Sequence, residues 1–496
     1  MMDMSFLKDV FGEFVPILPQ IVMVLATLTV PALFYANRSG KACAWFSLGA
    51  LALVGILVGL MMHDGTFYGD YAGLFSFDPF SGLMMLLFLA VAFLTVLVSP
   101  DSTEVTIHKG EYYAIIMGIV TGMFFVASAS NLMVLFVGVE VVSISSYALV
   151  ALKKNDPRAA EAAVKYFIVG GLSSALTLYG ISLFYGMTHT LDIAGVAAAV
   201  DTMEFTGAFA LATIALIAGY GFKIAAVPFH MWAPDVYEGA ATPVSGFLAT
   251  GSKKMGFVLF FKVFLMMFVV LRSGFATQEV QYLFAVIAAV TMTLGNIVAI
   301  SQSNIKRMLA YSSIAQAGYI LIALAVMSEY ALVGGMFHMF THVFMKFGAF
   351  IVVLSLIAAG LGERIQDYNG LAKRAPFVAF AMLLFLFSLA GIPPLAGFTS
   401  KFVLFSSAIY VNGAVVTQWV WLAIVAIVNS AISLYYYARV VKAMYVEEGP
   451  TDALAIRGGH KFAIALCVVA VILLGVFPTP LLEAIGDAAA HFFLAP

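Results

Sequence analysis

Charged side chains stand inside several strongly apolar stretches of this sequence, where their placement is costly. A charge at the middle of a membrane costs at least about 2.5–3.5 kcal/mol, so it needs a partner, a water-filled cavity or a function. A lysine that loses its hydration can release a proton, because desolvation disfavours the charged form, whereas a nearby carboxylate favours that form again. The set therefore indicates a function inside the membrane, and it comprises Glu140, Lys165, Lys223, Lys253, Lys254, Lys262, Lys346 and Lys401.

A second group forms a stripe along one predicted helix. His338, His342 and Lys346 follow one another at i, i+4 and i+8, so they share one helix face. Histidines at i and i+4 also suit a metal ion, but no carboxylate or cysteine accompanies them. We therefore favour a polar, water-lined helix face and predict no metal site in this chain.

Simpler explanations compete for individual lysines. Lys165 lies about 10 Å along its helix from Arg158, so its ammonium group could reach the membrane surface by snorkelling. For Lys262, snorkelling to the opposite surface is the favoured explanation. Lys253 and Lys254 are adjacent and point about 100° apart, so only one is expected to face the interior. So many charges over at least five apolar runs would nevertheless be a large cost without a role.

The elements that position these residues follow from the composition. Of 496 residues, 63% are hydrophobic and 10% are charged, whereas soluble domains carry about 25% charged residues. The surface must therefore mostly face lipid. The two cysteines, Cys43 and Cys467, lie far apart, which excludes a disulfide framework and an all-cysteine metal cluster. No glycine-rich nucleotide motif follows a strand pattern, so redox cofactors are expected elsewhere.

Runs of roughly 20 apolar residues, the length that crosses a membrane, recur along the whole chain. The first run follows acidic residues and lacks the basic lead of a signal peptide, so we interpret it as the first span. We predict an all-α, polytopic membrane protein of about fourteen transmembrane helices. The predicted spans are residues 14–35, 42–62, 80–100, 111–127, 131–152, 159–187, 207–229, 241–271, 279–301, 306–327, 331–360, 376–411, 415–445 and 461–483.

Lysine and arginine are concentrated in alternate loops, and cytoplasmic loops of membrane proteins carry such an excess. The loops after the first, fifth, ninth, eleventh and thirteenth spans are basic, whereas acidic residues predominate on the other side. Both termini are therefore expected on the outer side. The basic residues are Arg38, Lys41, Lys153, Lys154, Arg158, Lys306, Arg307, Arg364, Lys373, Arg374 and Arg457.

Prolines should interrupt two of the spans. Pro228 lies at the end of one helix and Pro393–Pro394 inside another, and proline removes a backbone donor and clashes with the preceding turn. Transporters use broken helices for ion sites within protein-lined cavities. Lys223 and Lys401 each lie near one of these breaks.

The two breaks suggest an internal repeat in which spans four to eight correspond to spans nine to thirteen. Five-span repeats must be inverted in the membrane, which suits two half-channels that open to opposite sides. We therefore divide the chain into a three-helix segment, a first and a second five-helix repeat, and a C-terminal loop with the last helix. Their residues are 1–110, 111–275, 276–445 and 446–496.

Three long segments resemble a known family. They are VPFHMWAPDVYEGAATPVSGFLATGSKKMG (227–256), QSNIKRMLAYSSIAQAGY (302–319) and LAGIPPLAGFTSKF (389–402). The chain is similar to the antiporter-like membrane subunits of respiratory complex I (NADH:quinone oxidoreductase), and most similar to subunit N, the counterpart of mitochondrial subunit 2. The family shares its fold with multisubunit sodium/proton antiporters. Two departures are GAATPVS, where the family usually has APTP, and the doubled Lys253–Lys254.

The resemblance implies a role for each matching residue. Glu140 corresponds to the fifth-span glutamate and Lys223 to the seventh-span lysine that pairs with it. Lys165 matches a sixth-span lysine, Lys253 the central eighth-span lysine and Lys401 the twelfth-span lysine near the outlet. Making or breaking the Glu140–Lys223 pair would load or discharge the lysine. Secondary candidates for the proton path are Lys254, His338, His342 and Lys346.

The implied function is proton translocation coupled to electron transfer from NADH to quinone, with no catalytic residue in this chain. FMN, iron–sulfur clusters and quinone are expected in other subunits. The expected partners are neighbouring antiporter-like and small membrane subunits, lipids and protons, and no nucleic acid. The expected location is a bacterial inner membrane, or alternatively a mitochondrial one.

Two other classes of function remain open. A sodium/proton antiporter subunit is one, although such relatives more often carry a histidine in the eighth span and lack the Ser252–Lys253 pair. A structural membrane scaffold with inert charges is the other, and the number of buried lysines argues against it.

Overall fold

The chain folds into helices with very little strand. The computed structural model describes residues 10–105, 109–201, 206–268, 274–411 and 414–494. Within these residues the strands form two short antiparallel hairpins, which are β1 (Gly69–Tyr71) with β2 (Phe75–Phe77) and β3 (Tyr410–Val411) with β4 (Ala414–Val415). The predicted all-α class is confirmed.

Twelve helices of the described residues are long and apolar enough to cross a membrane. Two further predicted spans, 241–271 and 376–411, are interrupted helices, which accounts for the difference from fourteen. The twelve are η1–α2 (Gly12–Ile17, Leu18–Asn37), α3 (Gly40–His63), α4–η3 (Pro79–Val98, Ser99–Asp101), α5 (Lys109–Ser128), α6 (Leu132–Val150), α7 (Pro157–Thr188), α9 (Gly207–Ile224), α14 (Gly274–Ser301), α15–α16 (Ile305–Ile320, Ile322–Val326), α17 (Glu329–Ala358), α21 (Val420–Tyr445) and α22 (Gly458–Val476).

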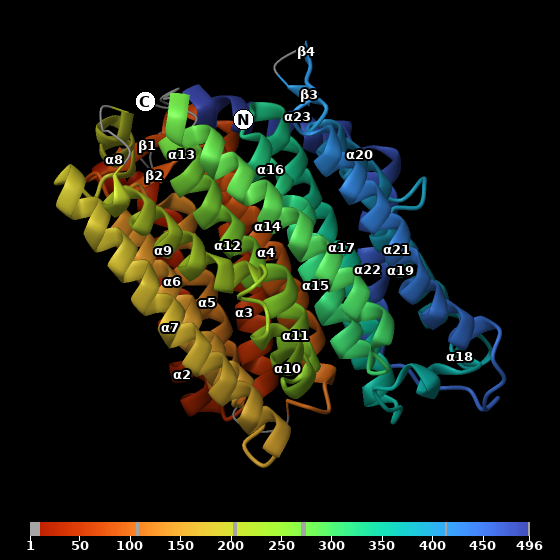
Figure 1. The fold of residues 1–496 in the computed structure, drawn as a ribbon. Coiled ribbons are helices and arrows are strands. Elements are labelled where there is room, and N and C mark those ends of the chain that lie inside the picture. The colour runs from red at the N-terminus through yellow and green to blue at the C-terminus, as the bar shows by residue number, and fades with distance from the viewer. Residues whose placement is uncertain (1–9, 106–108, 202–205, 269–273, 412–413, 495–496) are drawn as a thin grey trace.

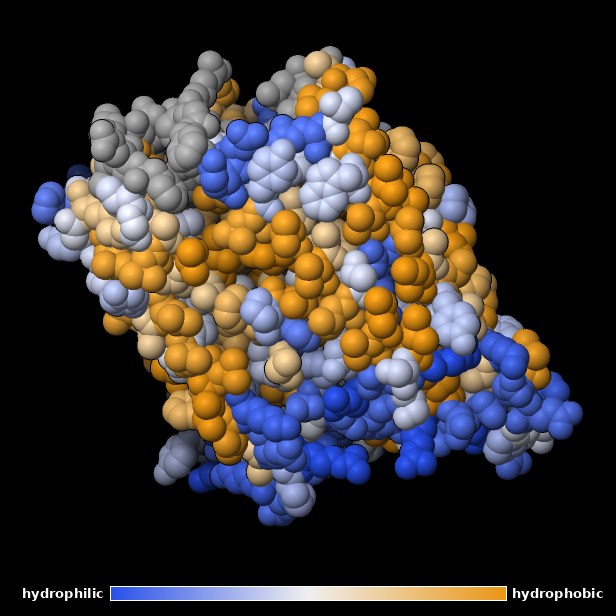
Figure 2. All heavy atoms as spheres, in the orientation of Figure 1, coloured by the Kyte–Doolittle hydropathy of each residue, from blue (hydrophilic) through white to orange (hydrophobic). Residues whose placement is uncertain are grey.

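The long helices lie side by side in one bundle (Figure 1). One end of the bundle carries α8 (Ile193–Asp201) and both hairpins, and we call it the α8 end. The opposite end carries α10 (Trp232–Gly239) and α18 (Leu371–Arg374), and we call it the α10 end. Figure 2 shows apolar residues over the middle of this face and hydrophilic residues along the rim at the α10 end, as expected for a surface surrounded by lipid.

Polar residues just before the helices determine where several spans begin. Asp78 accepts a hydrogen bond from the Ser81 backbone at 2.7 Å, and the Ser81 hydroxyl accepts one from the Asp78 backbone at 2.8 Å. This reciprocal capping box precedes α4. Asn131, Asp156 and Ser328 cap α6, α7 and α17 with a side-chain oxygen. Each cap satisfies amide groups that a membrane cannot hydrate.

The predicted span 241–271 changes twice to π-helical winding. A π turn inserts an extra residue and rotates the side chains that follow, and such turns are frequent at functional sites. The first π turn ends directly before Lys253. The elements are α11 (Thr242–Phe247), the π turn η4 (Leu248–Ser252), α12 (Lys253–Phe260), the π turn η5 (Phe261–Leu265) and α13 (Met266–Phe268), while residues 269–271 lie outside the described part.

The first proline break begins earlier than the sequence predicts. The span was expected to reach residue 229, but α9 ends at Ile224 because Ala225 adopts a left-handed conformation with φ 55°. Pro228 lies within the irregular stretch 225–231 that connects α9 to α10. The break therefore follows Lys223 almost directly.

The second break divides the predicted span 376–411 into two helices. α19 (Pro376–Ala390) ends at Gly391, whose φ of 93° favours glycine. Pro393 and Pro394 lie in the irregular stretch between Gly391 and Leu395. The chain then continues as α20 (Ala396–Ser406), which carries Lys401 on its second turn.

Several predicted boundaries are wrong. The last span, predicted as 461–483, ends at Val476, because Pro478 has no N–H donor to continue the helix. A separate helix, α23 (Thr479–Leu494), follows and packs against α4 and α17. The span predicted as 415–445 begins only at Val420, since residues 414 and 415 pair in β4. The short helices α8, α10, η2 (Gly65–Phe67), η6 (Ile365–Tyr368) and α18 were not predicted.

α17 is the central helix of the second half of the chain. It packs against α11, α15, α19, α20, α22 and α23, and it is among the most deeply buried of the long helices, together with α15–α16. The predicted stripe of His338, His342 and Lys346 therefore points into protein, not into lipid. The division into inverted repeats stays a prediction.

Candidate functional site: a buried row of basic side chains

Seven of the predicted site residues lie inside the bundle, and each exposes at most 4% of its surface. They come from four helices, of which α9 packs on α12 and α17 packs on α20, while the π turn η4 directly before α12 packs on α17. We call these seven residues the central basic row. They are Lys223, Lys253, Lys254, His338, His342, Lys346 and Lys401.

Lys223 begins the row, next to the break after α9. Its ammonium nitrogen forms no hydrogen bond within the described residues and lies 6.0 Å from the centre of the Tyr166 ring. The predicted partner Glu140 instead accepts a hydrogen bond of 2.5 Å from Ser174, although its charge acts on Lys223. The two groups thus interact across a gap, and the predicted pair is not closed in this structure.

Lys253 and Lys254 are both buried, contrary to the expectation that only one of them faces the interior. Lys253 lies 5.5 Å from the centre of the Tyr237 ring, and its nitrogen has no hydrogen-bond partner among the described residues. The charge of Lys254 acts on His338 and His342. The bundle encloses this part of the span on all sides, so neither lysine can turn toward lipid.

The stripe on α17 continues the row. His338 is hydrogen-bonded to Gln316 at 2.9 Å and to Ser400 at 3.0 Å, which links α15, α17 and α20. The rings of His338 and His342 are 6.1 Å apart, and both nitrogens of His342 are without a partner among the described residues. Lys346 donates to the Leu309 carbonyl at 3.0 Å and also to Ser312.

Metal binding finds no support in this geometry. Across the described ranges, no three His, Cys, Asp or Glu side chains gather in a way that could hold a metal ion. The stripe provides uncharged hydrogen-bond partners around His338 and a cation at its end. This chemistry suits proton exchange.

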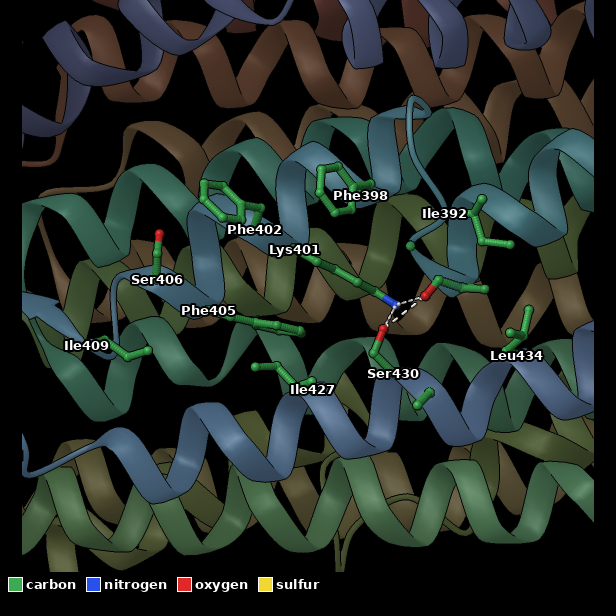
Figure 3. Close-up of a pocket in the computed structure, with 13 residues that line it drawn as sticks. Ile392, Phe398, Lys401, Phe402, Phe405, Ser406, Ile409, Ile427, Ser430 and Leu434 are labelled. Atoms are coloured by element: carbon green, nitrogen blue, oxygen red, sulfur yellow. Dashed lines mark hydrogen bonds between the residues drawn. The ribbon is translucent and has the colours of Figure 1, made fainter.

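Lys401 ends the row at the second helix break. Its ammonium group donates to the Leu389 carbonyl at 2.7 Å, the Ala390 carbonyl at 3.2 Å and the Ser430 hydroxyl at 2.9 Å. Figure 3 shows the bond to Ser430. These carbonyls end α19, where the break leaves backbone acceptors free and the helix dipole favours a cation. The surrounding cavity of about 430 Å³ is mostly apolar and includes Phe398 and Phe402. The free carbonyl groups at the helix break thus hold the Lys401 ammonium group in place.

Lys165 does not join the row. It lies at the α10 end with 44% of its side chain exposed, and it pairs with Glu161 at 2.6 Å and Asp235 at 2.7 Å. Arg307 contacts the same Asp235 at 2.6 Å and Glu238 at 2.8 Å. This ion network is built around the acidic residues of α10. The partly exposed position of Lys165 at the end of the bundle agrees with the snorkelling explanation.

A buried lysine that sequence reasoning assigned to a loop lies beside this network. Lys306 is fully buried and donates to the carbonyls of Glu238 and Ala240 and to the Glu363 carboxylate. Glu104, whose charge interacts with Lys306, accepts from the Thr242 backbone at 2.9 Å and so caps the N-terminus of α11. The only sequence signal was the adjacency of Lys306 to an apolar run.

Glu104 gives a pH-dependent expectation. Burial raises its pKa, but Lys306, the hydrogen bond from Thr242 and Lys153 outweigh burial, and the pKa is lowered overall. A carboxylate with a lowered pKa contributes stability above its unfolded pKa and loses it as the pH falls through the folded value. We expect Glu104→Gln to reduce thermal stability at neutral pH and to flatten the loss of stability below about pH 4. Unfolding temperatures of the purified complex across this range would measure both effects.

The exposed Glu447, which pairs with Lys442 on the surface, provides the matched control. Glu447→Gln should leave the acid dependence as in the wild type, since exposed pairs contribute little. If the Glu104→Gln protein lost stability in acid as steeply as the wild type, the contribution of Glu104 would be refuted.

Lys262 is buried as well, against the expectation of snorkelling. Its ammonium group donates to the Ala129 carbonyl at 2.9 Å, at the C-terminal end of α5. It borders a cavity of about 460 Å³ at the α8 end, which Asp70, Asp78 and Asp192 also line. The charge of Asp78 acts on Lys262. The side chain thus connects two elements of the fold near an acidic cavity.

A helical bundle of this size with a continuous row of buried basic groups defines an ion-translocating membrane protein, and comparison with known proteins narrows the class. The family described as "NADH:quinone oxidoreductase/Mrp antiporter, TM" matches residues 129–433. The chain belongs to this family and is a multi-pass membrane protein.

Curated relatives match over nearly the full length. F420H2 dehydrogenase subunit N of Methanosarcina mazei is 40% identical, over 96% of this chain and 98% of the relative. NADH-quinone oxidoreductase subunit N of Moorella thermoacetica is 42% identical, over 93% and 94%. The resemblance to subunit N noted from the sequence is confirmed.

Solved structures agree on the fold. A chain of respiratory complex I from Thermus thermophilus aligns with a TM-score of 0.80 and 29% identity, over 95% of this chain and 100% of that one. A chain of the Mrp complex from Dietzia aligns with a TM-score of 0.85 but only 21% identity, over 96% and 97%, which supports the shared fold alone.

Proposed function

We propose that this chain is a proton-translocating membrane subunit of an NADH:quinone oxidoreductase of the complex I type. The observation that carries the proposal is the central basic row, because seven buried basic groups in one bundle are costly unless they serve ion movement. Electron transfer from NADH to quinone would take place in other subunits and drive protons along the row. The chain itself would hold no redox centre.

The gap between Glu140 and Lys223 favours a mechanism in which Lys223 is loaded with a proton and then releases it, and we call this the charge-loading mechanism. Desolvation around Lys223 disfavours its ammonium form, and the Glu140 charge favours it. A movement that closes the gap between these groups would load Lys223 with a proton, and a movement that opens it would release the proton toward Lys253. The stripe on α17 would then pass the proton to Lys401. Redox-driven movement of neighbouring subunits would supply the change in the gap.

The family also contains antiporter subunits, which makes sodium translocation the competing function. The Mrp relative supports only the fold at its level of identity, whereas two subunit N relatives match at 40% and 42%. One of these belongs by name to an F420H2 dehydrogenase, so the electron donor needs its own test. NADH and reduced F420 supplied separately to the purified complex would identify it.

The remaining assignments follow from this function. FMN, iron–sulfur clusters and quinone would be held by other subunits, and neighbouring antiporter-like and small membrane subunits would be the partners. The basic α10 end, with Arg307 and Lys373, would face the cytoplasm of a bacterial cell. Both termini would then lie on the periplasmic side.

Glu140→Gln tests the charge-loading step. Glutamine keeps an oxygen that can accept from Ser174 but removes the charge that acts on Lys223. We expect proton translocation and quinone reduction to fall together by at least about tenfold, because Lys223 would no longer be loaded and a positioned proton-transfer group typically contributes about 100-fold or more. The measurement is acidification of sealed vesicles that contain the intact complex, driven by NADH in sodium-free buffer.

The exposed Glu483 on α23 offers a control, and Glu483→Gln should retain wild-type rates. Full pumping by assembled Glu140→Gln complex would refute the switch role of Glu140. If the wild-type complex required sodium and moved no protons, the antiporter function would replace the proposed one.

A further inference from the structure

A pocket at the α10 end lies outside the central basic row. It encloses about 690 Å³ between η6 and the last turns of α21. Three basic side chains line it, which are Arg364, Arg439 and Lys442, and Glu447 is the acidic residue of the lining. Three positive charges and one negative charge leave a net charge of +2. We call this the basic pocket, and its charge favours an anion.

Arg439 is the least satisfied of these groups. Its guanidinium donates to the Ile300 carbonyl at 2.7 Å and to the Gln302 carbonyl, which fixes it against the end of α14. Its Nε atom is buried and has no hydrogen-bond partner within the described residues. A charged donor that is left without an acceptor is costly. A phosphate group offers the oxygen acceptors that an arginine binds best.

The other two basic groups are accessible to an anion. Arg364 is exposed, and Lys442 keeps 64% of its side chain exposed while it pairs with Glu447 at 2.6 Å. Exposed ion pairs contribute little to stability, so a phosphate can replace the carboxylate at Lys442 at small cost. Gln366 and Asn369 add amide groups to the lining, and these can bind hydroxyl groups.

The same face of α21 carries an apolar stripe. Val428, Tyr435, Arg439 and Lys442 follow one another at i, i+7, i+11 and i+14, so they share one helix face. Val428 is 52% exposed and Tyr435 is 62% exposed, as expected for residues that contact lipid. The basic pocket therefore lies directly at the end of a lipid-facing stripe.

The dimensions of the stripe fit a lipid in one leaflet. Tyr435 lies about 10 Å and Val428 about 21 Å along the helix from Lys442, and half of the hydrocarbon core is about 15 Å thick. Tyr445, the last residue of α21, is 43% exposed. Tyrosine is enriched where a membrane meets water. Lys442 lies one turn before Tyr445, so the basic pocket is at the depth of the lipid head groups.

We propose that the basic pocket binds the phosphate of an anionic phospholipid such as phosphatidylglycerol, whose acyl chains lie along Val428 and Tyr435. The three basic residues would bind the phosphate, and the amide groups of the lining would bind the glycerol hydroxyls. A free phosphate would match the charge of the pocket but would leave the apolar stripe uncovered. The inference goes beyond the proposed function and needs only the position of the chain in a membrane.

A phosphatidylglycerol with a photoreactive diazirine in one acyl chain tests the site. The purified intact complex is placed in phosphatidylcholine vesicles that contain this probe, and cross-linked peptides are mapped by mass spectrometry. We expect cross-links on α21 between Val428 and Tyr435. Excess unlabelled phosphatidylglycerol should reduce them at least about tenfold, whereas phosphatidylcholine or inorganic phosphate in the same excess should not.

Charge variants test the head-group contacts. The double variant Arg364→Gln/Lys442→Gln should lower the cross-link yield at least about tenfold, because each basic residue at the membrane surface contributes about fivefold to the binding of anionic lipid. Glu447→Gln removes the acidic residue and should raise the yield, which a folding defect cannot cause. The matched control is Lys373→Gln/Lys461→Gln, which removes two exposed lysines that do not line the pocket.

Each other outcome overturns the proposal. Cross-links that are absent from residues 428–435, or equally frequent in the double variant and the wild type, would exclude the site. Equal competition by phosphatidylcholine would mean that only the acyl chains are recognised, and competition by inorganic phosphate would mean a site for free phosphate. If the double variant did not assemble, Arg364→Gln alone should lower the yield about fivefold, and an unchanged yield would refute the proposal. Lys223→Ala tests proton translocation separately, so the failure of one proposal leaves the other standing.

Discussion

Replacing Lys223 with alanine should abolish most coupled activity of the intact complex. We expect proton translocation and NADH-driven quinone reduction in sealed vesicles to fall together by at least about tenfold, since a positioned proton-transfer group typically contributes about 100-fold or more. Lys223 is buried, has no hydrogen-bond partner among the described residues and interacts with Glu140 across a gap. No other lysine on α9 can replace it.

The matched control is Lys461→Ala, because Lys461 is an exposed lysine at the start of α22 and should tolerate the change. Lys223→Arg keeps a positive charge but cannot release its proton, so it should be as inactive as alanine. Wild-type activity of an assembled Lys223→Ala complex would mean that the lysine is structural, and the mechanism would fail at its centre.

Composition and span length predicted the architecture well, because both depend on local properties. A membrane span requires roughly 20 apolar residues whatever its neighbours are, and the twelve long helices agree with predicted spans. The boundaries failed where backbone conformation decided them. Ala225 closes α9 with a left-handed conformation, and an alanine carries no sequence signal for such a turn.

The buried residues were predicted more easily than their partners. A lysine within an apolar run is visible in the sequence, and the seven members of the central basic row were all recognised. Whether a lysine points inward depends on tertiary packing, so Lys262 was wrongly expected at the surface, although it contacts Ala129. Lys306 was missed as a buried group for the same reason, because the backbone carbonyls that it binds belong to Glu238 and Ala240, more than 60 residues away in sequence.

The gap between Glu140 and Lys223 could not be predicted at all. The helices that carry them are separated by α7. Ser174 on α7 donates a hydrogen bond to the Glu140 carboxylate. Sequence similarity suggests that two residues pair, but it does not specify the conformation in which they do so. In the proposed charge-loading mechanism, this structure would be the open arrangement.

The two adjacent lysines on α12, Lys253 and Lys254, are expected to affect proton translocation to different extents. The charge of Lys253 acts on His230, at the first break, and also on His342 and Lys346 in the second half of the chain. Lys254 acts on the second-half groups His338, His342 and Lys346. Lys253 also lies 5.5 Å from the ring centre of Tyr237 on α10, whereas Lys254 lies 5.9 Å from that of Phe257 on its own helix. We infer that Lys253 connects the two halves and that Lys254 is an additional group.

We therefore expect Lys253→Ala to reduce NADH-driven proton translocation by at least about tenfold and Lys254→Ala to reduce it by only about two- to threefold, because the contribution of a positioned group depends on whether the path can bypass it. Vesicle acidification at equal complex content would measure both. Each variant serves as the control of the other, since both remove a buried lysine from the same turn and leave similar cavities. The reverse order of effects would assign the junction to Lys254, and equal losses would mean that the two lysines act as one unit.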